Sequence, residues 1–412
     1  MVDLRAEAAH HDELLRRRLD EIVPALMRRE GIDCWIVAGR EHAEDPVLST
    51  MLPSTWLSAR RRTVLIWFDD GSRHERFAVS RYAVADLFAT LVPAGTEPGQ
   101  WSAVGAAVAD RDPEKIAIGL SPTFPLADGM TASEHRALLE VLGPRADRVV
   151  SGEALAIGWL ETRLPEERAA FAEGCAVAHG ILRRGLTTEA IAPGVTSTED
   201  LEWWYRQSVH DAGLRSWFHP TVSIQRRGGT APQGFSARPT AEVITPGDLI
   251  HVDFGIVWKG LCTDQQEHLY VLAPGETAPP AGLTAGMAAG NRMQELLMGE
   301  FATGRTGNQI LAASLAAAAA ESIDALVYTH AIGVHGHAAG PTIGLWDQQD
   351  GVPGPGDYRL FPNTAYSIEL SVEVAVPEWD GQRVRAMLEQ DAWFDGEACT
   401  FLDGRQETIW VI

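Results

Sequence analysis

Two aspartates interrupt an otherwise apolar stretch in the second half of the sequence. Residues 249–264 read LIHVDFGIVWKGLCTD, and Asp264 lies eleven residues after Asp253. Charged side chains are seldom buried without a partner, because removing an ion from water costs several kcal/mol. Two strands of one hairpin would bring both carboxylates to the same edge of a sheet. The two aspartates do not specify a function by themselves, and their interpretation depends on residues further along the chain.

Further acidic and imidazole side chains follow downstream. The segment THAIGVHGHAAGPTIG contains His330, His335 and His337 among glycines, SIEL contains Glu369, and LEQD contains Glu389. Carboxylates that are held together repel one another and raise each other's pKa unless cations neutralise them. Carboxylate oxygens with one imidazole suit Mn²⁺, and Zn²⁺ or Co²⁺ also accept such a set. Two bridged ions can hold a hydroxide and polarise the carbonyl that it attacks.

Two domains are expected to position these side chains. In the first, a charged helix over 5–30 precedes apolar runs typical of strands, with helical patterns around 82–91 and 132–143, which predicts an α/β domain. A long helical pattern begins at Leu160, with Pro165 near its start. The boundary is therefore placed at 155/156, so that the first domain spans 1–155 and the second 156–412.

The second domain combines helices with strand patterns. Its second helix is expected after TSTEDLEWW, with Thr196 or Ser197 as the N-cap. Strand patterns follow in WFHPTVSIQ, DLIHVDFGIVW and HLYVL. An alanine-rich helical region over 284–325 comes next, and strand patterns resume from 328 to the end. We expect an α+β domain in which helices lie beside a largely antiparallel sheet.

Composition excludes several classes of partner. The chain has 34 basic and 56 acidic residues, a formal net charge of −22, so electrostatic repulsion opposes binding to nucleic acid. The first residues lack the apolar core of a signal peptide, and no run approaches the roughly 20 uncharged residues that span a bilayer. The four cysteines are widely spaced, which suits reduced, packed thiols in a cytoplasmic protein. They are Cys34, Cys175, Cys262 and Cys399.

The acidic residues and one histidine resemble, in order and spacing, the five metal ligands of the pita-bread metallopeptidases. That family includes Xaa-Pro aminopeptidases, prolidases and methionine aminopeptidases, and also creatinase, which lacks the metals. The resemblance covers the C-terminal half, and implies a pita-bread domain preceded by an α/β creatinase-like domain. Its ligand pattern has a glycine three residues after the histidine. His337 with Gly340 fits this pattern and is favoured over His335, which is followed by Ala338.

The resemblance implies roles for the remaining residues. Two divalent ions, with Mn²⁺ preferred, would be bound by Asp253, Asp264, His337, Glu369 and Glu389. Asp264 and Glu389 would bridge the ions, and Glu369 would also act as general base. His335 and His330 would be supporting groups near the site or polar residues of a glycine-rich loop.

Several positions depart from the family pattern. A second histidine is expected about seven residues after the ligand, and counting from His337 leads to Gly344, with Gln348 nearby. Another is expected about seventeen residues before the first aspartate, where this chain has Ser236. His219 is the nearest upstream candidate for a catalytic imidazole, although a histidine beside a strand-edge proline is an equal alternative.

Residues after the ligands also differ from the family. Asp264 is followed by Gln265, Gln266 and Glu267 in place of Thr-Arg-Thr, and Glu369 by Leu370 in place of Pro-Gly. The resemblance implies a dinuclear hydrolase of the Xaa-Pro dipeptidase or aminopeptidase type, acting on small peptides as a homodimer. The departures leave two alternatives open. One is a metalloenzyme for a modified amino acid or another small non-peptide substrate, and the other is a catalytically silent binding protein.

Overall fold

The chain folds into two compact units, which divide after Leu164. The computed structural model describes residues 3–91, 99–229 and 240–412, and the units are Met1–Leu164 and Pro165–Ile412. Helix α5 (Glu153–Glu161) belongs to the first unit because it packs on α1 (Leu4–Glu30). Arg18 of α1 donates to the carbonyl of Trp159 at 2.6 Å. The first unit therefore extends beyond the predicted boundary at 155/156.

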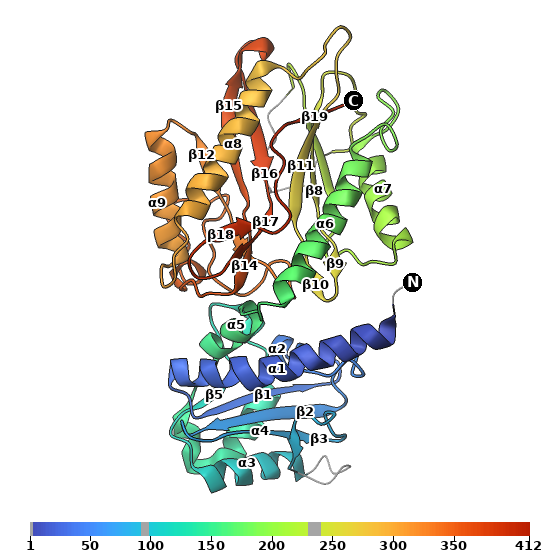
Figure 1. The fold of residues 1–412 in the computed structure, drawn as a ribbon. Helices are drawn as coiled ribbons and strands as arrows, with labels where there is room; N and C mark the ends of the chain where they lie inside the picture. Colours follow the sequence, from blue (N-terminus) through green and yellow to red (C-terminus); the bar gives the residue numbers. More distant parts are fainter. Residues whose placement is uncertain (1–2, 92–98, 230–239) are drawn as a thin grey trace. The chain divides into compact units, whose positions relative to one another are not determined.

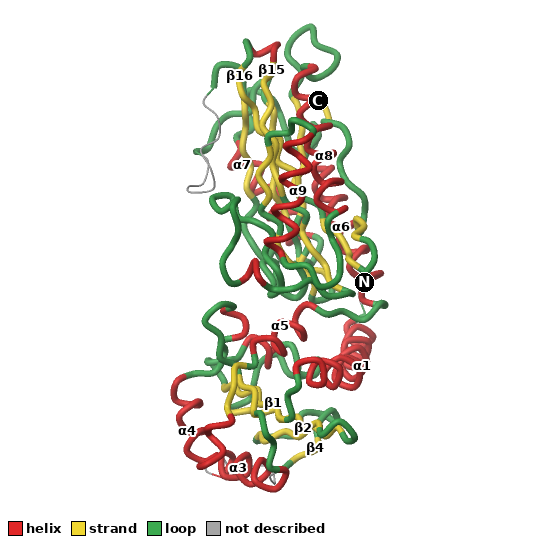
Figure 2. Tube along the Cα trace, turned by 90° about the vertical axis from the view of Figure 1, so that its left-hand side faces the viewer, coloured by secondary structure: helices red, strands yellow, loops and turns green. Residues whose placement is uncertain are grey.

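The first unit is built on a mixed sheet with strand order β4-β3-β2-β1-β5-β6. Helices α3 and α4 cover one face of the sheet and α1 lies on the other (Figures 1 and 2). Both faces are covered, which explains why β1 and β2 read as almost continuous apolar runs. The elements not yet placed are β1 (Cys34–Arg40), α2 (Pro46–Ser49), β2 (Arg62–Asp69), β3 (His74–Ser80), β4 (Ala89–Thr90), α3 (Gln100–Arg111), β5 (Ile116–Ile118), η2 (Pro125–Ala127), α4 (Ala132–Leu142), η3 (Gly143–Arg148) and β6 (Val149–Ser151).

One predicted helix of this unit is wrong, and one helix was missed. The helix predicted around 82–91 is wrong, since the segment forms turns and β4, and Ala85 has a φ of +46°, which a right-handed helix excludes. Helix α3 was not predicted. It packs closely on α4, because a Cβ at Gly105 would lie 2.7 Å from the carbonyl oxygen of Val141.

The second unit contains three larger sheets and a short hairpin. Their strand orders are β19-β11-β8-β7, β12-β15-β16 and β13-β14-β17-β18, with β9-β10 as the hairpin. Between the described strands of this unit, all pairings are antiparallel except that of β11 with β19. The elements are α6 (Glu167–Gly185), α7 (Thr198–Asp211), β7 (Thr221–Gln225), β8 (Leu249–Phe254), β9 (Val257–Trp258), β10 (Leu261–Cys262), β11 (Gln265–Tyr270), α8 (Ala281–Gly299), α9 (Gly307–Ala320), β12 (Ala325–Val327), β13 (His330–Ala331), η4 (Pro355–Asp357), β14 (Thr364–Ser367), β15 (Leu370–Val376), η5 (Pro377–Trp379), β16 (Gln382–Leu388), β17 (Asp391–Phe394), β18 (Cys399–Phe401) and β19 (Trp410–Val411).

Two helix pairs cover these sheets. Helices α6 and α7 pack on the sheet that contains β8 and β11, while α8 and α9 pack on the side of β12, β15 and β16 (Figure 1). This arrangement confirms the predicted α+β class. Ser197 is the N-cap of α7 and forms a capping box with Asp200. None of the helices in the described ranges combines the length and the apolar character needed to cross a lipid bilayer.

The alanine-rich region forms two helices rather than one. Helix α8 ends at Gly299, and Gly304 in the connection has a φ of +86°. Thr306 then caps α9, with Gln309 completing a capping box. The predicted region 284–325 therefore contains two helices separated by a turn, and the second helix ends at Ala320, before β12 begins at Ala325.

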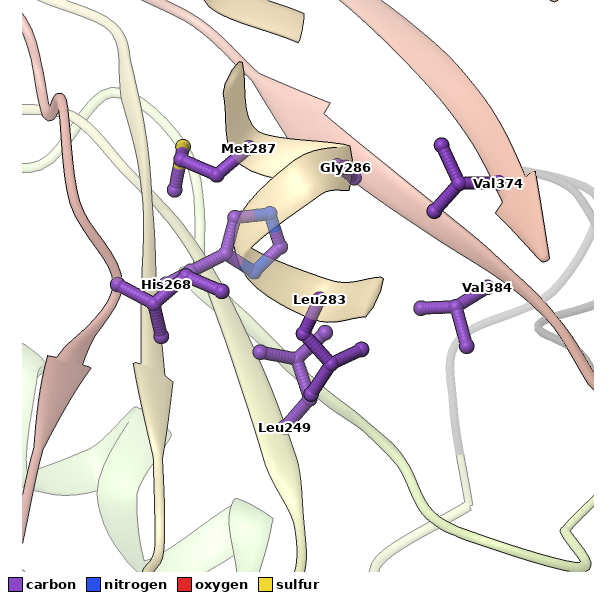
Figure 3. A pocket seen from close by; sticks show the side chains of 9 residues that line it. Leu249, His268, Leu283, Gly286, Met287, Val374 and Val384 are labelled. Atoms are coloured by element: carbon purple, nitrogen blue, oxygen red, sulfur yellow. The ribbon is translucent and has the colours of Figure 1, made fainter. Parts of the chain in front are cut away.

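A small cavity lies beside His268 of β11 (Figure 3). Its volume is about 10 Å³, and its lining is apolar apart from this histidine, with Leu249, Leu283 and Val374 among the lining side chains. The Nδ1–H of His268 donates to the carbonyl of Ile250, and its Nε2 accepts from a backbone N–H, both at 3.2 Å. Burial lowers the pKa of His268 to about 4. His268 is therefore a neutral core residue.

Candidate metal centre

The hairpin of β8 and β11 brings the two aspartates together. Gln266 of β11 pairs with Asp253 of β8, and Asp264 immediately precedes β11. The carboxyl groups of Asp253 and Asp264 lie close enough for each to affect the pKa of the other. The structure therefore confirms that this hairpin carries both side chains to one place.

The two glutamates reach the same place from the ends of other strands. Glu389 follows β16, and its carbonyl accepts the backbone N–H of Gln266 at 3.0 Å. The hydroxyl of Ser367, in β14, donates to Glu389 Oε1 at 2.6 Å. The Thr329 side chain fixes the backbone of Glu369, because Oγ1 accepts the Glu369 N–H at 3.0 Å and donates to the Glu369 carbonyl at 2.9 Å. Glu369 and Glu389 are thus held by the framework of the sheets.

His330 is the histidine that faces the carboxylates. Its Nδ1–H donates to the carbonyl of Ala331 at 2.9 Å, so its Nε2 carries the free lone pair. That Nε2 lies 3.8 Å from Asp264 Oδ2 and 3.6 Å from Glu389 Oε1. In the described part of the chain, Asp264, His330 and Glu389 each offer a ligand atom within 4.8 Å of the other two, and neither His335 nor His337 joins this group. The structure thus places His330 where the sequence predicted His337.

His337 occupies a different position next to His330. The two imidazole rings lie 4.8 Å apart at 90°, and the ring of Trp217 lies 5.4 Å from that of His337. His337 is solvent-exposed, whereas His330 is half-buried. Gly333 follows His330 by three residues and His337 follows it by seven, so the family spacing fits His330 as the ligand and His337 as the second histidine.

Counting from His337 predicted the loss of the second histidine, whereas counting from His330 leads to His337 at that position. Gly344, which was assigned that position, has a φ of +76°, and a Cβ there would lie 2.1 Å from the carbonyl oxygen of Val327. Glycine is therefore required at position 344, because the backbone is left-handed and there is no room for a Cβ atom. His335 contributes its carbonyl, which accepts the N–H of Gly333 at 3.0 Å.

The upstream histidine candidate lies against a helix. His219 Nδ1 accepts from Arg206 at 3.1 Å, and His219 Nε2 lies 3.3 Å from Glu202 Oε2, so α7 engages both ring nitrogens. These contacts match the structural alternative given for His219 in the sequence analysis. Ser236, the position predicted to replace the family histidine, lies outside the described residues.

The buried carboxyl groups of the site repel one another, and bound positive charge would stabilise them. Burial, followed by repulsion from Glu389, raises the pKa values of Asp253, Asp264 and Glu369 well above their usual range. Among the described residues, no hydrogen-bond partner reaches Oδ1 of Asp253, Oδ1 of Asp264 or Nε2 of His330. Buried acceptors without donors are costly unless a cation satisfies them. The donor set therefore fits hard or borderline divalent cations.

Two further residues support the cluster. Asp391 accepts the backbone N–H of Asp264 at 3.0 Å and the side chain of Gln265 at 3.2 Å. Gln266 donates to Glu369 Oε1 at 2.7 Å and to Glu389 Oε2 at 2.8 Å. The sequence analysis assigned neither residue a role. Asp391 stands in the LEQD motif two residues after Glu389, and that adjacency was the available signal.

The site is buried at its base and accessible on one side. Asp264 and Glu389 are 3% and 1% exposed, whereas Asp253, His330 and Glu369 are half-buried. A substrate that approaches from solvent would therefore meet His337, His330 and the two half-buried carboxylates first.

Sequence comparison decides the family. The model of metallopeptidase family M24 matches residues 169–391, which is more than half of the chain and includes Asp253, Asp264, His330, Glu369 and Glu389. The chain belongs to metallopeptidase family M24. No curated protein matches its sequence significantly. M24 membership and the likeness of the fold to solved structures confirm the predicted pita-bread architecture with a creatinase-like first unit.

Solved structures of similar fold include peptidases and the N-terminal domain of a subunit of the FACT complex. An X-Pro aminopeptidase from Thermotoga maritima aligns with a TM-score of 0.66 and 15% identity, covering 94% of this chain and 100% of that one. The dipeptidase PepE from Mycobacterium ulcerans gives 0.67 and 16%, covering 97% and 98%. The N-terminal domain of the FACT complex subunit SPT16 from Eremothecium gossypii gives 0.62 and 11%, covering 100% of both. At these identities the likeness concerns the fold.

Proposed function

We propose that this M24 member is a dinuclear metal-dependent hydrolase that cleaves the amide bond of small peptides of the Xaa-Pro type. The observation that carries the proposal is the unpartnered Nε2 of His330, which faces Asp264 and Glu389. The residues assigned to hold the cations are Asp253, Asp264, His330, Glu369 and Glu389. Mn²⁺ is the preferred ion for this oxygen-rich set with one imidazole, and Zn²⁺ and Co²⁺ are the alternatives.

Different side chains of the site are assigned different roles in hydrolysis. Bound divalent cations supply a water of lowered pKa and polarise the substrate carbonyl. Gln266 engages Oε1 of Glu369, so Oε2 is the atom assigned to take the proton from the attacking water. His337, exposed beside His330, donates a hydrogen bond to the oxygen on which negative charge develops. Trp217 packs against His337 and donates to the Thr263 carbonyl at 2.8 Å, which fixes this wall of the site.

A cytoplasmic homodimer is part of the proposal. Four cysteines without disulfides suit a reducing compartment. The family resemblance supports the dimer, because relatives with this two-domain arrangement commonly associate in pairs. Size-exclusion chromatography with light scattering tests the dimer, which a monomeric mass at micromolar concentration would exclude.

A substrate panel tests the hydrolase. The purified chain is incubated with Xaa-Pro dipeptides and with tripeptides that have proline second, each with added Mn²⁺, Zn²⁺ or Co²⁺ after dialysis against chelator. We expect proline-specific cleavage that depends on the metal and is lost in Glu369→Gln. Metal binding without cleavage of any peptide would contradict the proposed reaction.

A specialised non-peptide substrate is the second candidate. It is favoured by the buried amide of Gln266 against both glutamates, at a position where family peptidases have a different sequence. Robust cleavage of Xaa-Pro peptides would exclude it. The SPT16 domain shows that this fold also occurs in a subunit of a larger complex, and a protein without bound metal and without activity would favour such a binding role.

A further inference from the structure

We propose that Gln266 is a positioning residue that holds Glu369 and Glu389 in the geometry needed for metal binding, and that His251 fixes the orientation of its amide. The inference rests on the proposed metal centre. It goes beyond the ligand set because it assigns a role in metal affinity to two residues that would not touch the metal.

Gln266 contacts Glu389 through both its backbone and its side chain. Its N–H donates to the Glu389 carbonyl at 3.0 Å, and its Nε2 donates to Glu389 Oε2 at 2.8 Å. The same Nε2 donates to Glu369 Oε1 at 2.7 Å. One uncharged donor group thus joins two carboxylates that would otherwise repel each other. At 2% exposure, Gln266 has little freedom to leave this position.

His251 determines which way the amide points. Its Nε2 lies 2.8 Å from Oε1 of Gln266 and must donate its proton there, because an amide oxygen has no hydrogen. The reverse orientation of the amide would set its oxygen against two carboxylates and leave its NH₂ group facing the imidazole. His251 is itself only 5% exposed, and its ring packs on that of His268 at 5.1 Å. The imidazole is therefore held by the core.

These contacts run from the core to the metal centre. His251 of β8 orients Gln266 of β11. Gln266 in turn holds Glu369 Oε1 and Glu389 Oε2 at fixed positions. A ligand that is already oriented loses less conformational freedom when a cation binds. Removing the partner that orients a metal ligand typically lowers metal affinity by about 10- to 100-fold.

A matched pair of glutamine substitutions tests this role. Gln266→Met keeps the length of the side chain and removes the donor, so we expect Mn²⁺ affinity, measured by isothermal titration calorimetry, to fall by about 10- to 100-fold. Gln225→Met is the control. Gln225 of β7 is 4% exposed and pairs with the backbone of Arg385, at 2.7 and 2.9 Å, rather than with carboxylates. We expect Gln225→Met to lower thermal stability without changing Mn²⁺ affinity.

A second variant covers the case in which Gln266→Met does not fold. His251→Phe keeps an aromatic ring against His268 and removes the donor to the amide, and a smaller loss of Mn²⁺ affinity is expected because the amide can then rotate. Affinity equal to that of the wild type in both variants would overturn the inference, as would an equal loss in Gln225→Met. If the wild-type chain binds Mn²⁺ but cleaves no peptide, the proposed reaction is contradicted. The role of Gln266 in Mn²⁺ affinity is then still tested by the same calorimetric comparison of variants.

Discussion

The imidazoles of His330 and His337 lie side by side but have different environments. The Nδ1–H of His330 is committed to the Ala331 carbonyl, so Nε2 points its lone pair at Asp264 and Glu389. His337 is exposed to solvent and contacts the edge of Trp217. Orientation by a second hydrogen bond is typical of metal-binding histidines. Substitution of His330 and substitution of His337 should therefore change different properties, namely metal affinity and catalytic rate.

Alanine substitutions separate the two roles. We expect His330→Ala to lower Mn²⁺ affinity by more than the roughly 10- to 100-fold that loss of a ligand's partner costs. His337→Ala should keep Mn²⁺ affinity and lower kcat by about 10²- to 10³-fold, because it removes a donor to the developing oxyanion. Calorimetry and peptide hydrolysis measure the two effects, with His335→Ala as the control. The opposite pattern would restore His337 as the ligand.

The sequence predicted the carboxylates of the site better than its histidine. Asp253, Asp264, Glu369 and Glu389 lie at strands or strand ends, where alternation and pairing restrict the direction of a side chain. The three histidines belong to a glycine-rich segment whose path depends on the backbone dihedrals of each residue. A glycine follows both His330 and His337 by three residues, so that criterion does not choose between them. The histidine expected seven residues after the ligand does choose, because His337 follows His330 by seven residues, and this signal was missed.

At the scale of elements, apolar runs predicted strands reliably, whereas helix ends and turns were missed. The β1, β2 and β8 segments are mostly apolar because they are buried on both faces, whereas β11 is equally buried but mostly polar. Two short features were not visible in the pattern. Ala85 adopts a positive φ inside the predicted helix 82–91, and Gly304, with a φ of +86°, lies in the turn that interrupts the alanine-rich region.

Helix α6 offers two glycines with opposite expected effects. A Cβ at Gly185 would lie 2.3 Å from Cζ of Tyr205, a fully buried residue whose hydroxyl donates to the Leu182 carbonyl. Gly185→Ala should lower the free energy of unfolding by about 1–3 kcal/mol, because overpacking displaces the ring. Gly180 has nothing within 4 Å of its Cβ position. Gly180→Ala should raise stability by about 0.5–1 kcal/mol in the same urea titration.

A buried glutamate on β11 predicts a pH-dependent loss of stability. Burial raises the pKa of Glu267 from 4.5 to about 8, against hydrogen bonding from Gln390 and attraction to Arg183. Between these values the folded chain keeps a proton that the unfolded chain has released, so stability falls as pH rises, by at most about 1.4 kcal/mol per unit. Glu267→Gln should therefore gain stability relative to the wild type from pH 5 to pH 8. A constant difference in melting temperature would contradict this expectation.

At the scale of the molecule, the chain concentrates like charge in one place while carrying a net charge of −22. The carboxylates proposed as metal ligands and Asp391 lie in the second unit, and burial raises the pKa values of Asp253, Asp264, Glu369 and Asp391. Without cations, the folded chain can relieve repulsion in this cluster by taking up protons. Cations and protons should therefore compete for the same oxygens.

This competition predicts how metal removal changes stability with pH. In chelator, the four raised carboxyl pKa values mean that the folded state binds more protons than the unfolded state, so stability falls as pH rises above about 4. With Mn²⁺ bound, the ligand carboxylates are ionised in the folded state and this loss is relieved. The increase in melting temperature caused by Mn²⁺ should therefore be larger at pH 8 than at pH 5. Asp264→Asn, which removes one of the carboxylates proposed to hold the cations, should show little increase at either pH. An increase in the wild type that shrinks toward pH 8 would exclude carboxylate ligation as its source.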